Sequence, residues 1–326
     1  MPAGARRTGL PPSSLPTKSE RIAERKRAIG HQGIGRTARA RPYDPGMLLR
    51  RCVPAVLLAA LAAAVSCGDG AGAPQPGAAN PAGAPRARIV SLSPAITETV
   101  VRLGAADSVV GCTPWCRRPG VPAVGSLEDR DLEAIARLRP TLVLRQSLAE
   151  DPALRAVAAS VGAREGAWRL NSVDDARAFV GELGALLESA GVHGASARAD
   201  DVLRSHRERI RTPVSFGGPV LFLFSVDPLA AFGQGTYVDG LWGAMGGRNA
   251  VEATGYPSLT PEDVAALGAA GVVVVGAEPP AWLRETAARC VRIDAPSLLE
   301  PGAGMLLDGP VALRDADARL AGSAGP

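Results

Sequence analysis

The segment RIVSLSPAITETVVRLGAADSVVG at residues 88–111 decides the fold. Its first part, Arg88 to Leu92, is mostly apolar and typical of a short buried strand. Ser93 and Pro94 follow as a helix cap and a first-turn proline, so they predict a helix directly after that strand. The segment closes on a second apolar run. Strand, helix and strand in this order favour a parallel sheet covered by helices.

The same alternation continues on both sides of a helical stretch. The expected elements are a helix at 131–138, a strand at 141–144, a helix at 151–161, and then a strand at 220–224, a helix at 237–245, a helix opened by Thr260, a strand at 272–275, a helix at 281–289 and a strand at 291–293. Between these series, residues 172–212 carry apolar side chains at helical spacing. We therefore predict an α/β fold of two Rossmann-like lobes, residues 88–171 and 213–322, joined by a single long helical spine, with the ligand cleft between the lobes.

Two segments of the expected lobes are similar to each other. Glu133 begins the run EAIARL and Glu262 begins the run EDVAAL, and an apolar strand pattern follows each run. A glutamate, a β-branched residue, an alanine and a leucine recur at the same offsets. This repeat indicates that the lobes are related, and chance agreement in an alanine-rich chain is the alternative.

Basic residues are concentrated before the expected domain. The chain has 36 basic and 32 acidic residues, of which 12 basic and 3 acidic residues precede Cys52. The 24 basic and 29 acidic residues that remain make the folded part acidic. An acidic domain gives no support for nucleic-acid binding.

Residues 47–66 are typical of a bacterial export signal. Arg50 and Arg51 precede an apolar run that is too short to cross a bilayer, since spanning takes about 20 apolar residues. The run ends in AVSC, which resembles a lipobox, so we expect Cys67 to carry a lipid. An ordinary cleaved signal peptide is the alternative.

The segments on either side of this signal have no pattern of a folded domain. Residues 67–87 are rich in Gly, Pro and Ala and are expected to form a flexible tether. Residues 1–46 have no place in an arrangement of signal, lipid and tether. They are interpreted as a non-native extension, with translation starting at Met47.

Three cysteines remain in the expected domain, and an exported protein meets an oxidising compartment. Cys112 and Cys116 frame the sequence CTPWC, and Cys290 lies far along the chain. A disulfide within CTPWC and a longer one that includes Cys290 are both open. A metal site is the weaker interpretation, because the three histidines are distant from CTPWC in sequence.

Together, residues 88–111, LEDRDLEAIARLRPTLVL from Leu127 and GLWGAMGGRNAVEATGYPSLTPEDVAALGAAGVVVVG from Gly240 resemble the helical-backbone class of periplasmic binding proteins. That class serves cobalamin, haem and iron-siderophore importers, and the cobalamin receptors are the most similar. The resemblance extends from about Arg88 to beyond Gly302. It implies two lobes bridged by one long helix, little hinge motion and a ligand held between the lobes.

Ligands of parallel α/β lobes lie beyond the carboxyl ends of strands, so the strand-to-helix loops are the expected contact sites. The expected ligand-binding residues are Ser93, Pro94, Ala95, Trp115, Leu127, Phe232, Gly233, Tyr256 and Pro257. Free N–H groups at a helix start favour an oxygen of the ligand, and aromatic faces suit a broad, flat one. We predict that Trp115 and Tyr256 face one another and contact a corrinoid. Core or surface packing is the alternative role of these rings.

The resemblance supports Tyr256, which aligns with an aromatic residue that cobalamin receptors place against the ligand. It is less close elsewhere, because Leu127 and Gln146 stand where those receptors have aromatic residues. Haem or a ferric siderophore therefore remains the rival ligand, with Tyr237 or Tyr256 as an iron-side contact. The resemblance also implies that Glu133 and Glu262 present one carboxylate on each lobe to arginines of a permease.

Other classes of function have less support. A zinc or manganese receptor needs several converging histidines, whereas His193 and His206 both belong to the expected spine. An enzyme is not expected, because G-x-S-x-G, H-E-x-x-H and a phosphate loop ending in lysine are all missing from the sequence. A ligand sensor without a transporter is the third alternative. We expect a monomer in the periplasm or cell envelope, anchored by its lipid alone, with no cofactor and no resident metal.

Overall fold

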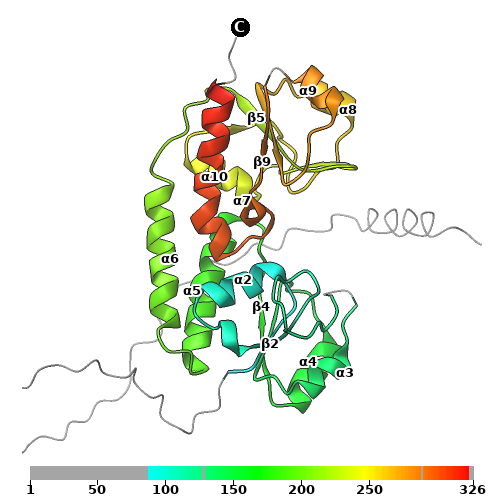
Figure 1. The fold of residues 1–326 in the computed structure, drawn as a ribbon, viewed down its shortest axis with the longest axis vertical. Coiled ribbons are helices and arrows are strands. Elements are labelled where there is room, and N and C mark those ends of the chain that lie inside the picture. Colours follow the sequence, from blue (N-terminus) through cyan, green and yellow to red (C-terminus); the bar gives the residue numbers. More distant parts are fainter. Residues whose placement is uncertain (1–86, 127–128, 288, 323–326) are drawn as a thin grey trace, which may run out of the picture. The chain divides into compact units, whose positions relative to one another are not determined.

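The computed structural model describes residues 87–126, 129–287 and 289–322. Cys67, Leu127 and the segments expected to form the signal, the tether and the N-terminal extension lie outside these ranges. The described residues form two α/β lobes with helices beside them, as expected from the sequence (Figure 1). None of the helices in this part of the chain is both long and apolar enough to cross a bilayer.

The first lobe is built on a parallel sheet in the order β2-β1-β3-β4. Its elements are β1 (Ile89–Ser91), α2 (Pro94–Arg102), η1 (Ala106–Ser108), β2 (Val109–Cys112), α3 (Leu132–Arg137), β3 (Leu142–Arg145), α4 (Pro152–Ser160) and β4 (Arg164–Ala167). Both sheet faces are covered, since Ile89 packs in one apolar cluster and its neighbour Val90 in another. This explains why the strands read as continuous apolar runs.

The second lobe repeats this plan with an added edge. Its elements are β5 (Pro219–Val226), β6 (Leu229–Ala231), α7 (Tyr237–Ala244), β7 (Arg248–Asn249), α8 (Pro261–Ala266), β8 (Gly271–Val275), α9 (Ala281–Thr286), β9 (Cys290–Ile293) and η2 (Pro296–Leu299). Strands β5, β8 and β9 are parallel neighbours, while β6 pairs antiparallel with β5. Helix α3 leads into β3, which pairs with the first strand of its lobe, β1. Helix α8 leads into β8, which pairs in the same way with β5. The sequence repeat therefore occupies equivalent places in the two lobes.

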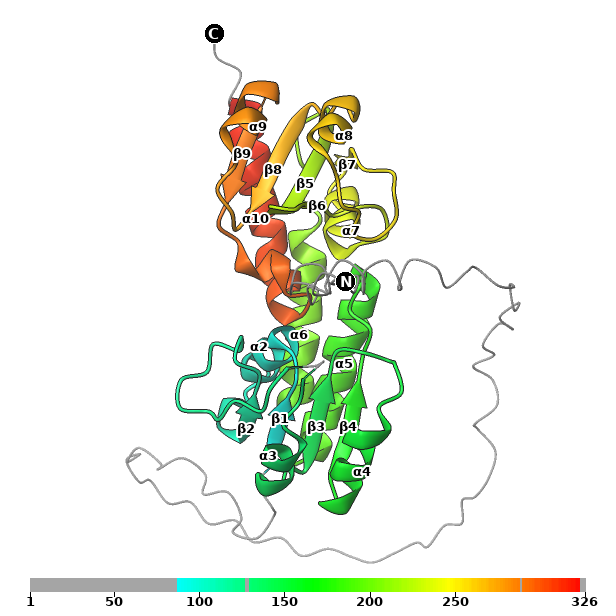
Figure 2. The same cartoon turned by 90° about the vertical axis from the view of Figure 1, so that its right-hand side faces the viewer.

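The stretch expected to form a single helical spine consists of two helices. These are α5 (Val173–Ser189) and α6 (Ala195–Arg209), which pack side by side (Figures 1 and 2). Gly191 and Gly194 in the turn between them have φ of 86° and 78°, the left-handed region that glycine adopts without strain. Of the two, α6 continues alongside both lobes (Figure 1).

Short polar side chains begin several of the expected helices. Asp131 accepts a hydrogen bond from the Ala134 N–H at the start of α3, at 2.8 Å. Thr260 and Asp263 form a reciprocal capping box at the start of α8. These contacts satisfy N–H groups that the helix itself leaves unpaired, which is why the sequence predicts the helix starts well.

Three strands and one helix were not expected from the sequence. Strand β7 has only two residues, β4 includes the charged Arg164 and Glu165, and β6 has the sequence LAA, which lacks β-branched residues. Helix α9 ends at Thr286, earlier than expected, and β9 already begins at Cys290.

The unexpected helix, α10 (Ala303–Gly322), contains Pro310. A proline has no N–H for the carbonyl one turn earlier, here that of Leu306. The Nδ1 atom of His206 in α6 lies 3.0 Å from this carbonyl oxygen. Burial lowers the pKa of His206, so the neutral ring donates a hydrogen bond to the carbonyl. A partner from another helix thus supplies the bond that the proline removes.

The start of α10 joins the two lobes. The Ala303 N–H donates to Thr99 Oγ1 and the Gly304 N–H donates to Glu98 Oε2, both at 3.0 Å. Both acceptors belong to α2 of the first lobe, and a carboxylate at a helix N-terminus is further favoured by the helix dipole. One lobe therefore caps a helix of the other.

Close approach at this junction depends on Gly302. A Cβ atom there would lie 2.5 Å from Thr99 Oγ1 and 2.9 Å from the Ala95 carbonyl oxygen. Gly302→Ala is therefore expected to lower the free energy of unfolding by about 1–3 kcal/mol, measured by urea denaturation. Gly243→Ala is the control, because a Cβ atom in that part of α7 meets nothing within 4 Å. Equal stability of the two variants would contradict the tight junction.

Candidate ligand-binding site

The carboxyl ends of the parallel strands in both lobes face the region between the lobes (Figure 2). In the first lobe, Ser93 follows β1 and Gln146 follows β3, and Ser93 Oγ donates to Gln146 Oε1 at 2.8 Å. Ser93 occupies the cap position of α2, but its hydroxyl makes no capping bond. The expected cap is thus replaced by a bond between two strand ends.

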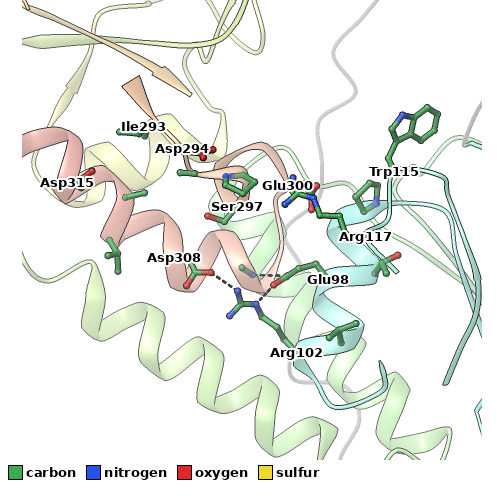
Figure 3. A pocket seen from close by; sticks show the side chains of 18 of the residues that line it. Glu98, Arg102, Trp115, Arg117, Ile293, Asp294, Ser297, Glu300, Asp308 and Asp315 are labelled. Carbon is green, nitrogen blue, oxygen red and sulfur yellow. Dashed lines mark hydrogen bonds and ion pairs between the residues drawn. The ribbon is translucent and has the colours of Figure 1, made fainter. Parts of the chain in front are cut away.

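A hollow of about 1180 Å³ lies where α2, the turn after β2, the segment after β9 and α10 meet (Figure 3). Its volume is sufficient for a large organic ligand. Charged residues of both signs line it: Glu98, Arg102, Arg117, Arg118, Arg209, Asp294, Glu300, Asp308, Asp315 and Arg319. Some of these charges are already paired, since Arg102 binds Asp308 at 2.6 Å and Arg319 binds Asp315 at 2.8 Å.

Two of the expected contact residues of the first lobe line this hollow, namely Pro94 and Trp115. Trp115 stands on the turn after β2 with 63% of its surface exposed, so most of its ring is accessible to a ligand. Ser93 and Ala95 are buried beside Pro94. Of the three residues expected at the start of α2, only Pro94 therefore lines the hollow.

The expected aromatic residues of the second lobe form a separate cluster. The rings of Phe224, Phe232, Tyr237 and Tyr256 pack edge to face or tilted, with centroids 5.0–6.5 Å apart. Phe232 and Tyr237 are buried, whereas Tyr256 is 43% exposed. Tyr256 is therefore the outer ring of the cluster, and Phe232 supports it from within.

The loop that carries Tyr256 is held in place by backbone hydrogen bonds. The Gly233 N–H donates to the Gly255 carbonyl at 2.8 Å, and the Ala231 N–H donates to the Pro257 carbonyl at 3.0 Å. A Cβ atom on Gly233 would lie 2.1 Å from the Ala253 carbonyl oxygen. Gly233 and Pro257 thus hold this loop against the chain after β6.

Glu300 is a site residue that the sequence analysis missed. It lines the hollow, is half-buried, and contributes to raising the pKa of Tyr237 in the aromatic cluster, after burial and the neighbouring Tyr256. Burial raises the pKa of Glu300 itself, and Arg117 of the first lobe opposes that rise. Glu300 therefore lies between the hollow and the aromatic cluster. A lone acidic residue beside Pro301 carries no signal of this position in the sequence.

The structure brings the expected residues together only partly. Trp115 lines the hollow, whereas Tyr256 lies in the aromatic cluster and is not among the hollow's lining residues.

Metal ligands do not gather in the described ranges, which contain no cluster of three or more His, Cys, Asp and Glu side chains able to hold an ion.

The two expected docking residues are exposed on short helices. Glu133 in α3 binds Arg137 one turn later at 2.8 Å, and its side chain is 83% exposed. Glu262 lies in the first turn of α8 and is also exposed. Helices α3 and α8 lie at opposite ends of the described domain, on the side away from α6 (Figure 1).

Residues 89–279 match the family described as periplasmic binding protein. The chain belongs to this family. None of the curated proteins is similar enough in sequence to be a match.

Solved structures of periplasmic binding proteins have the same fold. The periplasmic heme-binding protein BhuT, in complex with two hemes, is 22% identical over 73% of this chain and 99% of its own, with a TM-score of 0.57. The heme-binding protein RhuT from Roseiflexus sp. RS-1 is 24% identical over 72% and 100%, with a TM-score of 0.54. The vitamin B12 binding protein BtuF of Vibrio cholerae is 19% identical over 73% and 98%, with a TM-score of 0.56.

The burial of Glu300 is expected to make the stability of the protein depend on pH. Its pKa is higher in the folded protein than the ordinary 4.5, so folding binds a proton between the two values and stability falls as pH rises through that window. Glu300→Gln is therefore expected to raise Tm relative to wild type at about pH 7 and to leave it unchanged at about pH 3.5. Thermal unfolding followed by circular dichroism measures both. The exposed Glu252→Gln serves as control, and equal Tm of Glu300→Gln and wild type at neutral pH would refute the assignment.

Proposed function

We propose that this periplasmic binding protein is a lipid-anchored, extracytoplasmic receptor that captures a corrinoid of the cobalamin type and delivers it to the permease of an ABC importer. The observation that carries the proposal is the large hollow with the exposed Trp115 ring at its edge. An exposed tryptophan on the rim of a cavity offers a flat surface on which a macrocycle can stack.

The charges of the hollow favour a corrinoid over haem. A corrinoid carries amide groups, which both donate and accept hydrogen bonds. Arg117 can donate to an amide oxygen, while Glu300 and Asp294 can accept from an amide N–H. The carboxylates of haem could pair with the arginines of the hollow but would offer no donor to its acidic side chains.

Haem is the second candidate, and one observation favours it. The side chain of Tyr256 is partly exposed beside the buried Tyr237, and its phenol oxygen could bind ferric iron. Two of the structurally similar proteins described above bind heme. Titration of the protein with cyanocobalamin, haemin and a ferric siderophore, followed by calorimetry, distinguishes these ligands.

The anchor is part of the same proposal. Cys67 ends the lipobox-like AVSC after a short apolar run, and the tether that follows would let the domain move at the membrane surface. Incorporation of a labelled fatty acid into wild-type protein, and its loss in Cys67→Ser, tests the anchor. Equal labelling of both proteins would refute it.

Trp115→Ala is expected to weaken corrinoid binding about tenfold or more, because loss of one buried aromatic contact removes a few kcal/mol. Trp115→Phe keeps a ring at the rim and should retain most of the affinity. Calorimetry measures both dissociation constants, and an unchanged Tm shows that the fold is intact. Wild-type affinity in Trp115→Ala would contradict the proposed site.

The proposed permease contact rests on Glu133 and Glu262, which are exposed and occupy equivalent places in the two lobes. One carboxylate on each lobe would allow a receptor with internal twofold similarity to dock on a twofold transporter. The double variant Glu133→Ala/Glu262→Ala is expected to abolish uptake of labelled cobalamin while ligand affinity and Tm stay nearly unchanged.

The matched control replaces two other exposed glutamates, one on each lobe, in Glu150→Ala/Glu285→Ala. This control should transport normally, because neither residue lies on α3 or α8. Normal uptake by the Glu133/Glu262 double variant, or loss of ligand binding in it, would refute these residues as the docking pair.

A further inference from the structure

The turn that carries Trp115 is framed by two cysteines. Cys112 is the last residue of β2, and residues 113–116 fold into a turn in which the Cys116 N–H donates to the Thr113 carbonyl at 3.0 Å. Pro114 occupies the second position of this turn, where its fixed φ is favourable. The turn brings Cys116 back toward the end of the strand and leaves Trp115 projecting.

Both cysteines are buried beneath this turn. They belong to the same apolar cluster, and Cys116 lies close enough to Cys112 to contribute to raising its pKa. The sulfur of Cys116 also lies 3.0 Å from Thr97 Oγ1 and 3.1 Å from Thr113 Oγ1. The third cysteine of the described domain, Cys290, lies on β9 in the other lobe. Of the pairings left open by the sequence, only the one within CTPWC joins two cysteines of the same lobe and the same apolar cluster.

One of the two cysteines is held rigidly by its backbone. The Cys112 N–H donates to the Pro122 carbonyl at 3.1 Å, and its carbonyl accepts from the Val124 N–H at 2.9 Å. A covalent link from Cys112 to Cys116 would therefore fix the turn to an anchored strand end. The closed loop would contain five residues, of which Trp115 is the fourth.

We propose that Cys112 and Cys116 form a disulfide in the exported protein, and that this bond holds the turn presenting Trp115 to the hollow. The compartment that would allow the bond rests on the proposed function, since a periplasmic location is oxidising. The turn already returns the chain from Cys112 to Cys116 within one buried cluster, which is the proximity that a disulfide requires.

The oxidant is an external disulfide. The thiolate of one cysteine attacks it, which breaks the external S–S bond, forms a mixed disulfide and releases one thiolate. The thiolate of the other cysteine then attacks the mixed disulfide, forms the Cys112–Cys116 bond and releases the second thiolate. The two protons lost by the protein thiols are taken up by the released thiolates. The two cysteines are oxidised by two electrons, and the external disulfide is reduced to two thiols.

Burial affects when this exchange can occur. It raises the pKa of Cys112 to about 12, and the neighbouring Cys116 adds to the rise, so in the folded protein the thiol is protonated and shielded. The bond should therefore form while the chain folds, before the turn packs against Thr97. Refolding in the presence of a disulfide is the condition that tests it.

The experiment uses the full chain, denatured and reduced, and then refolded in a buffer of reduced and oxidised glutathione. Free thiols are alkylated under denaturing conditions and the protein is digested with trypsin. Cleavage after Arg102 and Arg117 leaves both cysteines in one peptide, Leu103–Arg117. The expected result is that this peptide carries no alkyl group and is lighter by two thiol hydrogens than the reduced peptide.

A second measurement compares Tm with and without a phosphine reductant. Closing a five-residue loop is expected to raise Tm by about 4–8 °C, so the reductant should lower it by that amount. Cys112→Ser/Cys116→Ser should lose this response, whereas the control Cys290→Ser should keep it. A Leu103–Arg117 peptide with two alkyl groups, or one linked to another peptide, would overturn the proposal. Neither measurement involves ligand, so a protein that forms the bond but binds no corrinoid would refute only the proposed function.

Discussion

The capping of α10 by α2 is the interaction on which the rest of the structure depends. Thr99 and Glu98 of the first lobe accept hydrogen bonds from N–H groups of Ala303 and Gly304, at the first turn of a helix that belongs to the second lobe. A helix end buried without such partners would be costly, because its N–H groups would be removed from water and left unpaired. The lobes therefore cannot separate at this point without exposing or orphaning the start of α10.

Helix α6 reinforces this junction from the side. Arg198 near its start donates to the Leu103 carbonyl of the first lobe at 2.8 Å, and Arg209 at its end donates to the Leu307 carbonyl of α10 at 2.9 Å. A site between lobes held in this way is largely formed before the ligand arrives, so binding need not include the cost of closing a hinge. The same rigidity gives the two exposed glutamates a constant separation.

The two aromatic parts of the candidate site, the cluster around Tyr256 and the Trp115 turn at the hollow, are held differently. Tyr256 is supported by Phe232 and by a loop held through backbone hydrogen bonds, so its ring has a constant position. Trp115 stands on a turn and is mostly exposed. Glu300 connects the two regions electrostatically, because it lies close enough to affect the pKa of Tyr237 and to be affected by Arg117. A large ligand bound in the hollow would meet an aromatic ring, arginines and carboxylates together.

The sequence by itself determined the α/β class, the two lobes and most helix starts, because burial periodicity and capping are local patterns. Caps such as Asp131 and the Thr260–Asp263 pair lie within four residues of the groups they satisfy. Only the tertiary structure decided the remainder. Helix α10 was unexpected because Pro310 breaks the local pattern, and the compensating bond from His206 comes from 100 residues away. Glu300 likewise became a site residue only through folding, since Arg117 and Glu98, which affect its pKa, belong to the other lobe.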